Sequence, residues 1–369
     1  MSPDAKKRAA VAYVGLLPPP VTGQRLAGQK IVDRLSAETD VHVFRLLTAR
    51  GESRLWRGLR KALKSIMASV WLVFTRFRFP HVRLFMMPSA GPGRWLDLFL
   101  GILGRGLGYR VFLRYPVYSY IDEYDHKLAW FVGSIGTHGG HFLLCEEMKD
   151  DFVGMYSPRA PCYELSNGFG IPVKVGVESQ SPEGALHLGH ISNLAVEKGL
   201  DEVLATYSRM RENKVPVVLH LAGPFSTDTE RVMVEKACER HEGIRYWGAV
   251  YDEEKWEFFG HLDAMLFPTR YRHEGQPNVV VESLISGVPV LSYARACIPA
   301  LIGERGGVAF DRDEDFVDKA STLLTTWAEY PALLHQAKTD AEAQGERVRA
   351  KADQDLERLV EILVRGVLS

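Results

Sequence analysis

Short hydrophobic runs alternate with amphipathic segments along most of the chain. Runs of this length, separated by segments whose apolar residues recur every three or four positions, predict β-strands that alternate with α-helices. This alternation predicts parallel sheets covered by helices on both faces. The predicted strands are 11–15, 41–46, 82–86, 110–113 and 141–145, then 186–191, 217–222, 264–268, 288–292 and 308–310. The most regular predicted helices are 22–35, 200–212 and 228–241.

The series of predicted strands is interrupted once, by the polar segment 172–184. We therefore predict an α/β protein with two doubly wound, Rossmann-like domains, residues 1–171 and 185–345, joined by that segment as a linker. The last residues, 346–369, are expected to form a helix that packs back towards the N-terminal domain. Doubly wound domains bind ligands at the carboxyl ends of their strands, so a cleft between two facing domains is the expected site.

The overall composition is that of a globular protein with 369 residues, 46% of them hydrophobic and 25% charged. The net charge of −1 gives no reason to expect nucleic-acid binding. Four cysteines and twelve histidines are scattered without the spacing of a metal site, so no bound metal is expected. So few cysteines in a chain of this length are typical of a reducing, cytoplasmic location.

One segment departs from this neutral balance. Between Arg45 and Arg83 there are ten lysines and arginines and one acid, Glu52. Within 50–75 the basic residues recur at helical spacing with apolar residues on the other side, which predicts an amphipathic helix. Two interpretations stay open: the apolar side packs on its own domain, or the helix docks on an anionic membrane surface. The uncharged stretch 65–75 is too short to span a bilayer, so the second interpretation implies peripheral association at the inner face of the plasma membrane.

The most informative chemistry lies near Glu274 and Glu282, which stand eight positions apart. The first acid lies in a predicted loop and the second in a short predicted helix that ends before a Gly-Val-Pro sequence. The loop offers a carboxylate for hydroxyl groups, and the start of the helix offers backbone N–H groups for a phosphate. A nucleotide-sugar presents both kinds of group. The simpler interpretation of Glu274 is an acid favoured by the helix dipole.

With these residues in place, the second half of the chain resembles the nucleotide-sugar half of family 4 retaining glycosyltransferases of the GT-B fold, of the bacterial cell-surface polysaccharide type. The two acids match the family's Glu-x7-Glu signature. The other similar stretches of the second half are 188–199, with a lysine turn, 220–224, with a glycine turn, and 263–269. In the first half, 18–23, 118–122, 144–148 and 165–168 resemble one bacterial branch of the family.

The resemblance implies roles for individual residues. Glu274 would bind the transferred sugar, Lys198 would hold the departing diphosphate, and both would be catalytic. Glu282 would accept hydrogen bonds from the ribose hydroxyls, since ionised carboxylates are strong acceptors. The other donor-binding candidates contribute backbone groups, close approach of the chain, or a polar side chain in the lysine turn. They are Gly275, Gln276, Asn278, Val279, Gly223, Gly23 and Asn193.

Two departures from the family pattern stand out. Asn193 occupies a position where many members have an arginine, so phosphate binding would depend more on Lys198 and the helix start. In the first domain, 114–117 replaces a run of histidines, and we hypothesise that Arg114 substitutes for them in the expected cleft. Tyr118 and His141 are further candidates there, although a core or loop position explains His141 more simply.

The sequence thus predicts a retaining glycosyltransferase that needs neither a metal nor a cofactor. It would move a sugar from a nucleoside-diphosphate-sugar to a cell-surface polysaccharide, lipid-linked saccharide or glycolipid. Two alternatives remain. A non-catalytic partner of an active transferase is suggested by Asn193 and the missing histidines, and a sugar-nucleotide epimerase would need an acid–base cluster that the sequence does not display.

Overall fold

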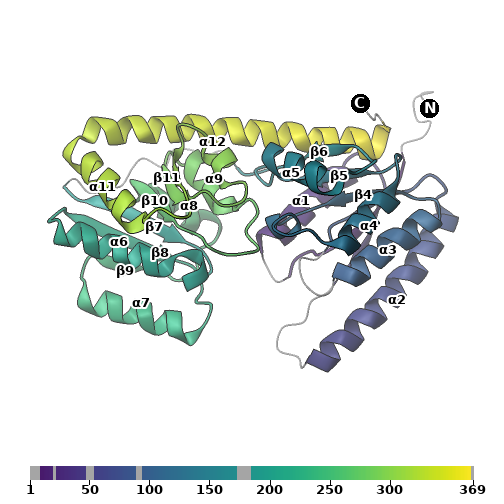
Figure 1. The fold of residues 1–369 in the computed structure, drawn as a ribbon, viewed down its shortest axis with the longest axis horizontal. Coiled ribbons are helices and arrows are strands. Elements are labelled where there is room, and N and C mark those ends of the chain that lie inside the picture. The colour runs from purple at the N-terminus through teal and green to yellow at the C-terminus, as the bar shows by residue number, and fades with distance from the viewer. Residues whose placement is uncertain (1–8, 20–21, 47–53, 89–93, 173–183, 367–369) are drawn as a thin grey trace. The chain divides into compact units, whose positions relative to one another are not determined.

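The computed structural model describes residues 9–19, 22–46, 54–88, 94–172 and 184–366. The chain forms two compact units, and each contains one six-stranded sheet (Figure 1). Unit 1 comprises Met1–Gly170 and Lys351–Ser369, and unit 2 comprises Ile171–Ala350. The proposed linker, 172–184, lies largely outside the described residues.

The sheet of unit 1 has the strand order β2-β1-β3-β4-β5-β6, and every pairing is parallel. All five residues of β1 are buried, as expected for a central strand of a parallel sheet that is covered on both faces. The strands are β1 (Val11–Gly15), β2 (Val41–Arg45), β3 (Arg83–Met86), β4 (Arg110–Arg114), β5 (Gly140–Leu143) and β6 (Cys162–Glu164).

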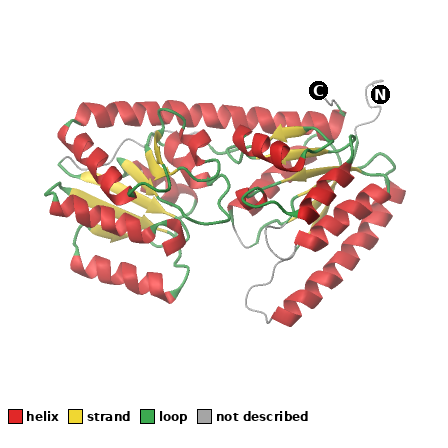
Figure 2. Ribbon diagram, in the orientation of Figure 1, coloured by secondary structure: helices red, strands yellow, loops and turns green. Residues whose placement is uncertain are grey.

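Helices connect these strands and cover the sheet, as Figure 2 shows. Helix α1 buries Ala27, Ile31 and Leu35, which lie on one helical face because they are four residues apart. The end of the last long helix, α12 (Pro331–Val360), and the short π-helix η4 (Glu361–Arg365) that follows it add buried residues from Ala352 to Val364 to the same core. The remaining helices of unit 1 are α1 (Gly23–Ser36), α2 (Arg54–Arg78), α3 (Arg94–Gly106), α4 (His126–Ile135) and α5 (Glu146–Tyr156), with a short turn η2 (Tyr118–Tyr120).

The sheet of unit 2 is also wholly parallel and has the order β12-β11-β10-β7-β8-β9. From β7 the chain first adds strands on one side and then returns to add β10 on the other, so the direction of winding reverses between β7 and β10. The strands are β7 (Leu186–Ile191), β8 (Val217–Ala222), β9 (Ile244–Tyr246), β10 (Ala264–Phe267), β11 (Val290–Tyr293) and β12 (Gly307–Phe310).

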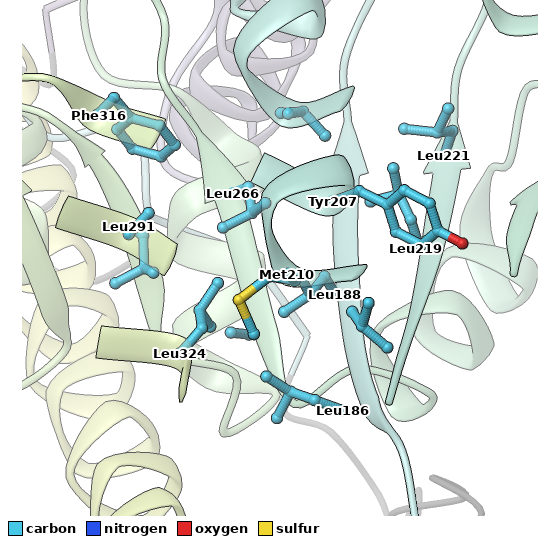
Figure 3. Packing of buried hydrophobic residues seen from close by; sticks show 14 of the residues in the cluster. Leu186, Leu188, Tyr207, Met210, Leu219, Leu221, Leu266, Leu291, Phe316 and Leu324 are labelled. Carbon is cyan, nitrogen blue, oxygen red and sulfur yellow. The ribbon is translucent and has the colours of Figure 1, made fainter. Parts of the chain in front are cut away.

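One core of unit 2 lies between this sheet and two helices. Figure 3 shows leucines of β7 and β8 directed towards Tyr207 and Met210 of α6, with Phe316 and Leu324 of α11 completing the cluster. The helical elements of unit 2 are η3 (Val196–Lys198), α6 (Leu200–Glu212), α7 (Asp228–Arg240), α8 (Asp252–Gly260), α9 (Asn278–Ile285), α10 (Ile298–Ile302), α11 (Phe316–Glu329) and the first part of α12.

The predicted fold class, two doubly wound α/β units, is confirmed. Each predicted strand lies within about two residues of an observed one. Two strands of three residues, β6 and β9, were not predicted. No helix among the described residues is both long enough and apolar enough to cross a membrane.

Candidate donor site in unit 2

Two of the predicted site residues of unit 2, Lys198 and Glu274, lie in the segments that follow β7 and β10, where the winding of the sheet reverses. Open parallel sheets leave a crevice there because the chain departs in opposite directions from the two neighbouring strands. The turn after β7 carries Lys198, and the loop after β10 carries Glu274 and leads into α9.

The two loops approach each other closely because of Gly199. Its φ of +87° lies in the left-handed region, and a Cβ atom there would lie 2.4 Å from the carbonyl oxygen of Pro268. A residue with a side chain would both strain the backbone and overlap the neighbouring loop. Glycine at this position therefore allows the lysine turn to rest on the residue that follows β10.

Lys198 and Glu274 form an ion pair at this junction. The Lys198 Nζ donates to Glu274 Oε2 at 2.5 Å, and the Thr269 hydroxyl donates to the same oxygen at 3.1 Å. The ammonium group also lies 4.5 Å from the ring centroid of Tyr271, within cation–π distance. Both charged side chains are largely buried, so their interaction is screened less than a surface pair would be.

Two arginines hold the acidic loop in position, and the sequence did not suggest either of them. Arg270 contacts Asp201 of α6 at 2.7 Å through Nη2, and its backbone N–H donates to the carbonyl of Glu197 at 2.9 Å. Further along, Arg295 Nη2 donates to the carbonyl of Arg272 at 2.7 Å. The loop that carries Glu274 is therefore fixed on two sides.

Glu282 lies on α9 and is paired with Lys255, which belongs to α8. The Lys255 Nζ donates to Glu282 Oε1 at 2.6 Å, while Glu282 Oε2 is buried and accepts no hydrogen bond from the described residues. One helical turn earlier, the buried Oδ1 of Asn278 also lacks a donor within the described part of the chain. Buried acceptors are normally satisfied, so a water molecule or a ligand has to donate a hydrogen bond to each of these two oxygens.

The remaining donor-site candidates of unit 2 lie around the start of α9 and the loops after β7 and β8. Gly275 accepts a backbone hydrogen bond from Cys297 at 3.1 Å, and Gln276 is buried. Val279 is half-buried in the first turn of α9, where backbone N–H groups have no partner within the helix. Asn193, in the loop after β7, is exposed.

Gly223 shapes the loop after β8. A Cβ atom at this residue would lie 1.8 Å from the carbonyl oxygen of Ser192, and its φ is +118°. Only glycine therefore permits the close approach of this loop to the loop after β7. Gly223 therefore has a structural role: it lets two loops meet at the edge of the candidate site.

A buried histidine supports the same loop and was not predicted. His190 Nδ1 lies 2.8 Å from the carbonyl oxygen of Leu266, so this nitrogen carries the proton, and Nε2 accepts from the Ser192 hydroxyl at 2.9 Å. Burial lowers the pKa of His190 to about 4, which keeps the ring neutral near pH 7. This neutral histidine links β7, β10 and the loop that begins at Ser192.

The candidates of unit 1 lie in different surroundings. Arg114 is wholly buried and donates through Nη2 to Asn167 Oδ1 at 2.5 Å, and burial lowers its pKa to about 10. His141 is also wholly buried, 3.0 Å from the Tyr115 hydroxyl, and burial lowers its pKa to about 3. These placements favour structural roles within unit 1.

Two candidates of unit 1 are more accessible. The Tyr118 hydroxyl donates to Asp151 Oδ2 at 2.6 Å, and burial, followed by this bond, raises the pKa of Tyr118. Gly23 is exposed at the first position of α1. Among the described residues of both units, no three His, Cys, Asp or Glu side chains form a group that could hold a metal ion.

The second unit matches a known protein family. Residues 185–326 match the family model described as glycosyl transferases group 1. This segment contains Lys198, Glu274 and Glu282. No curated protein sequence matches the chain.

Several solved structures have the same fold at low sequence identity. Sucrose-phosphate synthase from Thermosynechococcus elongatus superimposes with a TM-score of 0.71 at 12% identity, covering 96% of this chain and 99% of that one. HepE from Anabaena, solved with UDP-glucose, gives 0.68 at 11% identity, covering 96% and 100%. The lipopolysaccharide outer core galactosyltransferase WaaB gives 0.68 at 13% identity, covering 95% and 98%.

The likeness extends over nearly the full length of these three proteins, and the family match lies on the unit that holds the paired acids and the lysine. The protein therefore has the GT-B fold of glycosyltransferases, and its second unit matches the group 1 glycosyl transferases.

Proposed function

We propose that the protein is a retaining glycosyltransferase, related to family 4, that uses a nucleoside-diphosphate-sugar as its donor. One observation carries the proposal. At the reversal point of the unit 2 sheet, a paired Lys198 and Glu274 are followed by α9, on which one buried oxygen of Glu282 accepts no hydrogen bond from the described residues. A cation, a carboxylate and unsatisfied acceptors together match the phosphates and hydroxyls of such a donor.

Each part of the donor has a proposed partner. The ribose hydroxyls donate to Glu282, with Asn278 as a second acceptor one turn away. Lys198 and the backbone N–H groups at the start of α9 bind the diphosphate. The lysine carries a full positive charge, and the start of the helix carries a partial positive charge from the helix dipole. Glu274 accepts hydrogen bonds from the transferred sugar.

In the proposed reaction, the bond between the anomeric carbon and the diphosphate oxygen breaks while the acceptor oxygen bonds to the same face of the sugar. The proton of the acceptor hydroxyl passes to the leaving diphosphate. Lys198 stabilises the negative charge that develops on that group, and Glu274 stabilises positive charge at the sugar. These roles require no protein nucleophile, no cofactor and no metal.

The proteins of similar fold suggest which donors and acceptors to test first. HepE was solved with UDP and glucose and with UDP-glucose, and WaaB is a lipopolysaccharide galactosyltransferase. We therefore propose UDP-sugars as the first donors and a bacterial polysaccharide, lipid-linked saccharide or glycolipid as the acceptor, with unit 1 on the acceptor side and the reaction in the cytoplasm.

Release of free nucleoside diphosphate from a panel of donors tests the proposal, with a bacterial lipid-linked saccharide fraction as the acceptor. Glu274→Gln should lower turnover by about a hundredfold or more, because it removes charge stabilisation from the reacting sugar. Glu197→Gln is the matched control, since this acid is exposed on the adjoining turn. Turnover that persists in EDTA would support the metal-independent mechanism. Equal turnover of both variants would contradict the role of Glu274.

A non-catalytic partner remains the second candidate because Asn193 offers no charge to a diphosphate. It predicts donor binding without turnover in the unmodified protein. An epimerase would instead convert the donor sugar without releasing diphosphate. The same assay, followed by analysis of the sugar, separates the three functions.

A further inference from the structure

Helix α2 of unit 1 exposes a continuous stripe of large apolar side chains. Val70, Phe74 and Phe77 are 65%, 67% and 82% exposed. These residues share a helical face with Leu59, Leu63, Ile66 and Met67, all of which are exposed. At 3.6 residues per turn, the seven positions occupy about a third of the circumference of the helix and run about 27 Å along it.

The opposite side of α2 faces its own unit. Ala68 and Leu72 are wholly buried, and Ser65 and Thr75 are nearly so. Two hydrogen bonds fix this orientation: the Tyr109 hydroxyl donates to the carbonyl of Leu72 at 2.7 Å, and Arg76 Nε donates to the carbonyl of Leu107 at 3.0 Å. The exposed stripe therefore belongs to a helix that is already packed.

This arrangement argues against the interpretation that the large apolar residues of α2 pack on their own domain. If α2 used its large apolar residues to pack on its own domain, they would be buried. Instead, Leu59, Leu63, Ile66, Met67, Val70 and Phe74 are exposed. A stripe of this size on a surface normally marks a contact with a membrane or another molecule.

Positive charge lies beside the stripe. Arg60 and Arg78 are exposed at its edge, and Lys64 is half-buried further round the helix. No acidic residue occurs from Arg54 to Arg83. An apolar face bordered by arginine and lysine is typical of helices that lie in the plane of an anionic bilayer.

Neighbouring helices also expose large apolar side chains. Figure 1 shows α2, α3 and α4 side by side in unit 1. Trp95 and Phe99 of α3 and Trp130 of α4 are exposed, and the Lys127 ammonium lies 4.1 Å from the ring centroid of Trp95. Tryptophan beside lysine is common where proteins meet lipid headgroups.

We propose that α2 is an in-plane membrane anchor that inserts its apolar stripe into an anionic lipid surface. Charge favours this occupant over a second copy of the chain, because two copies would bring the same basic edges together. Hydrophobic insertion supplies the affinity, and the basic residues select acidic headgroups. The inference goes beyond the proposed transferase activity and does not depend on it.

Flotation of the full chain with lipid vesicles tests the anchor. The protein should float with vesicles that contain phosphatidylglycerol and remain largely unbound with pure phosphatidylcholine. Lys64→Gln with Arg78→Gln should reduce binding to the acidic vesicles. Equal binding to both vesicle types, or binding to neither, would overturn the proposal, as would concentration-dependent dimerisation that buries the stripe.

Two apolar variants separate insertion from simple charge attraction. Phe74→Ser and Phe77→Ser should each weaken vesicle binding by about tenfold, since burying a phenylalanine contributes roughly that factor or more. Leu333→Ser, at a half-exposed leucine of α12 in unit 2, is the control and should bind as the parent does. Unchanged binding by both phenylalanine variants would overturn insertion. UDP-sugar binding, measured on the same variants without vesicles, should not change, so a failed anchor is distinguishable from a failed donor site.

Discussion

At the scale of single residues, the ion pair with Lys255 determines which oxygen of Glu282 is available to a ligand. Its ammonium lies 2.6 Å from one carboxylate oxygen and leaves the other as a buried acceptor. Both side chains are more than three-quarters buried. Removal of the lysine would leave a carboxylate without its charge partner in a position largely shielded from water.

We expect Lys255→Met to lower the free energy of unfolding by about 2 kcal/mol and to weaken donor binding by about tenfold. Lys236→Met, at an exposed position of α7, is the control. Urea unfolding and titration with a UDP-sugar measure the two effects. The double variant Lys255→Met with Glu282→Gln should lose less free energy of unfolding than the two single variants lose together, because the two side chains are coupled. Additive effects would contradict the coupling.

Buried histidines predict how stability depends on pH. Burial lowers the pKa of His141 to about 3, of His190 to about 4 and of His220 to about 3. In the unfolded chain these rings take up protons below about pH 6.5, and in the folded protein they do not. Above about pH 6.5 these rings are neutral in both states and cost no stability. As the pH falls from there towards the folded pKa values, protonation of the unfolded chain lowers the free energy of unfolding.

Urea unfolding at about pH 7.5 and about pH 5.5 should give a lower free energy of unfolding at the lower pH. In His141→Gln the loss should be smaller, by up to about 1.4 kcal/mol per pH unit, because one titrating group is removed while a partner for the Tyr115 hydroxyl is kept. Identical pH dependence in the parent and the variant would show that His141 is not the cause.

Glu274 and Glu282 are candidates from the local sequence pattern, and Lys198 is a candidate from the resemblance of 188–199 to a known family. Sequence spacing gave no indication of Lys255 or His190, because their partners Glu282 and Leu266 are 27 and 76 positions away. Side chains that support a site are selected by three-dimensional contact, and one sequence does not record such contacts.

At the scale of elements, glycine turns decide how closely the loops of unit 2 approach. Gly223 and Gly248 both have positive φ, but a Cβ atom on Gly223 would overlap Ser192, while one on Gly248 would meet nothing within 4 Å. Gly248→Ala should therefore cost only about 1 kcal/mol of backbone strain. Gly223→Ala should cost about 3 kcal/mol and weaken donor binding, because the loop after β7 has to move. Thermal unfolding compares them, and equal losses would refute the steric explanation.

The strength of the hydrophobic signal explains which strands were predictable. Strands β7 and β8 are almost continuously buried, and their predicted bounds agree with the structure. Strand β9 lies at the edge of its sheet and has one buried residue, Ile244. An edge strand with two exposed residues shows no periodicity, so the sequence did not indicate it. Helix α2 shows a different limit: its helical periodicity was predicted, but the sequence pattern did not show which of its faces is buried.

At the scale of the whole molecule, α12 contributes to both units. Residues up to Ala350 belong to unit 2, and the remainder belongs to the core of unit 1. Leu359 is wholly buried there, while Leu333, near the other end of the helix, is 50% exposed. We expect Leu359→Ala to destabilise the protein by about 2–5 kcal/mol and Leu333→Ala to have little effect. Calorimetric unfolding of both variants checks this, and similar midpoints would contradict the assignment of Leu359 to a core.

The division of the chain also determines the order in which the units become complete during synthesis. Unit 2 is one continuous stretch, whereas unit 1 needs side chains from Ala352 to Val364 to close its core. Those side chains follow all of unit 2 in the chain, so they leave the ribosome after it. Although domains of a nascent polypeptide generally fold from the N-terminus onwards, here the second domain has all its residues first. The core that the first 170 residues contribute to unit 1 therefore stays incomplete until the residues from Ala352 to Val364 have emerged.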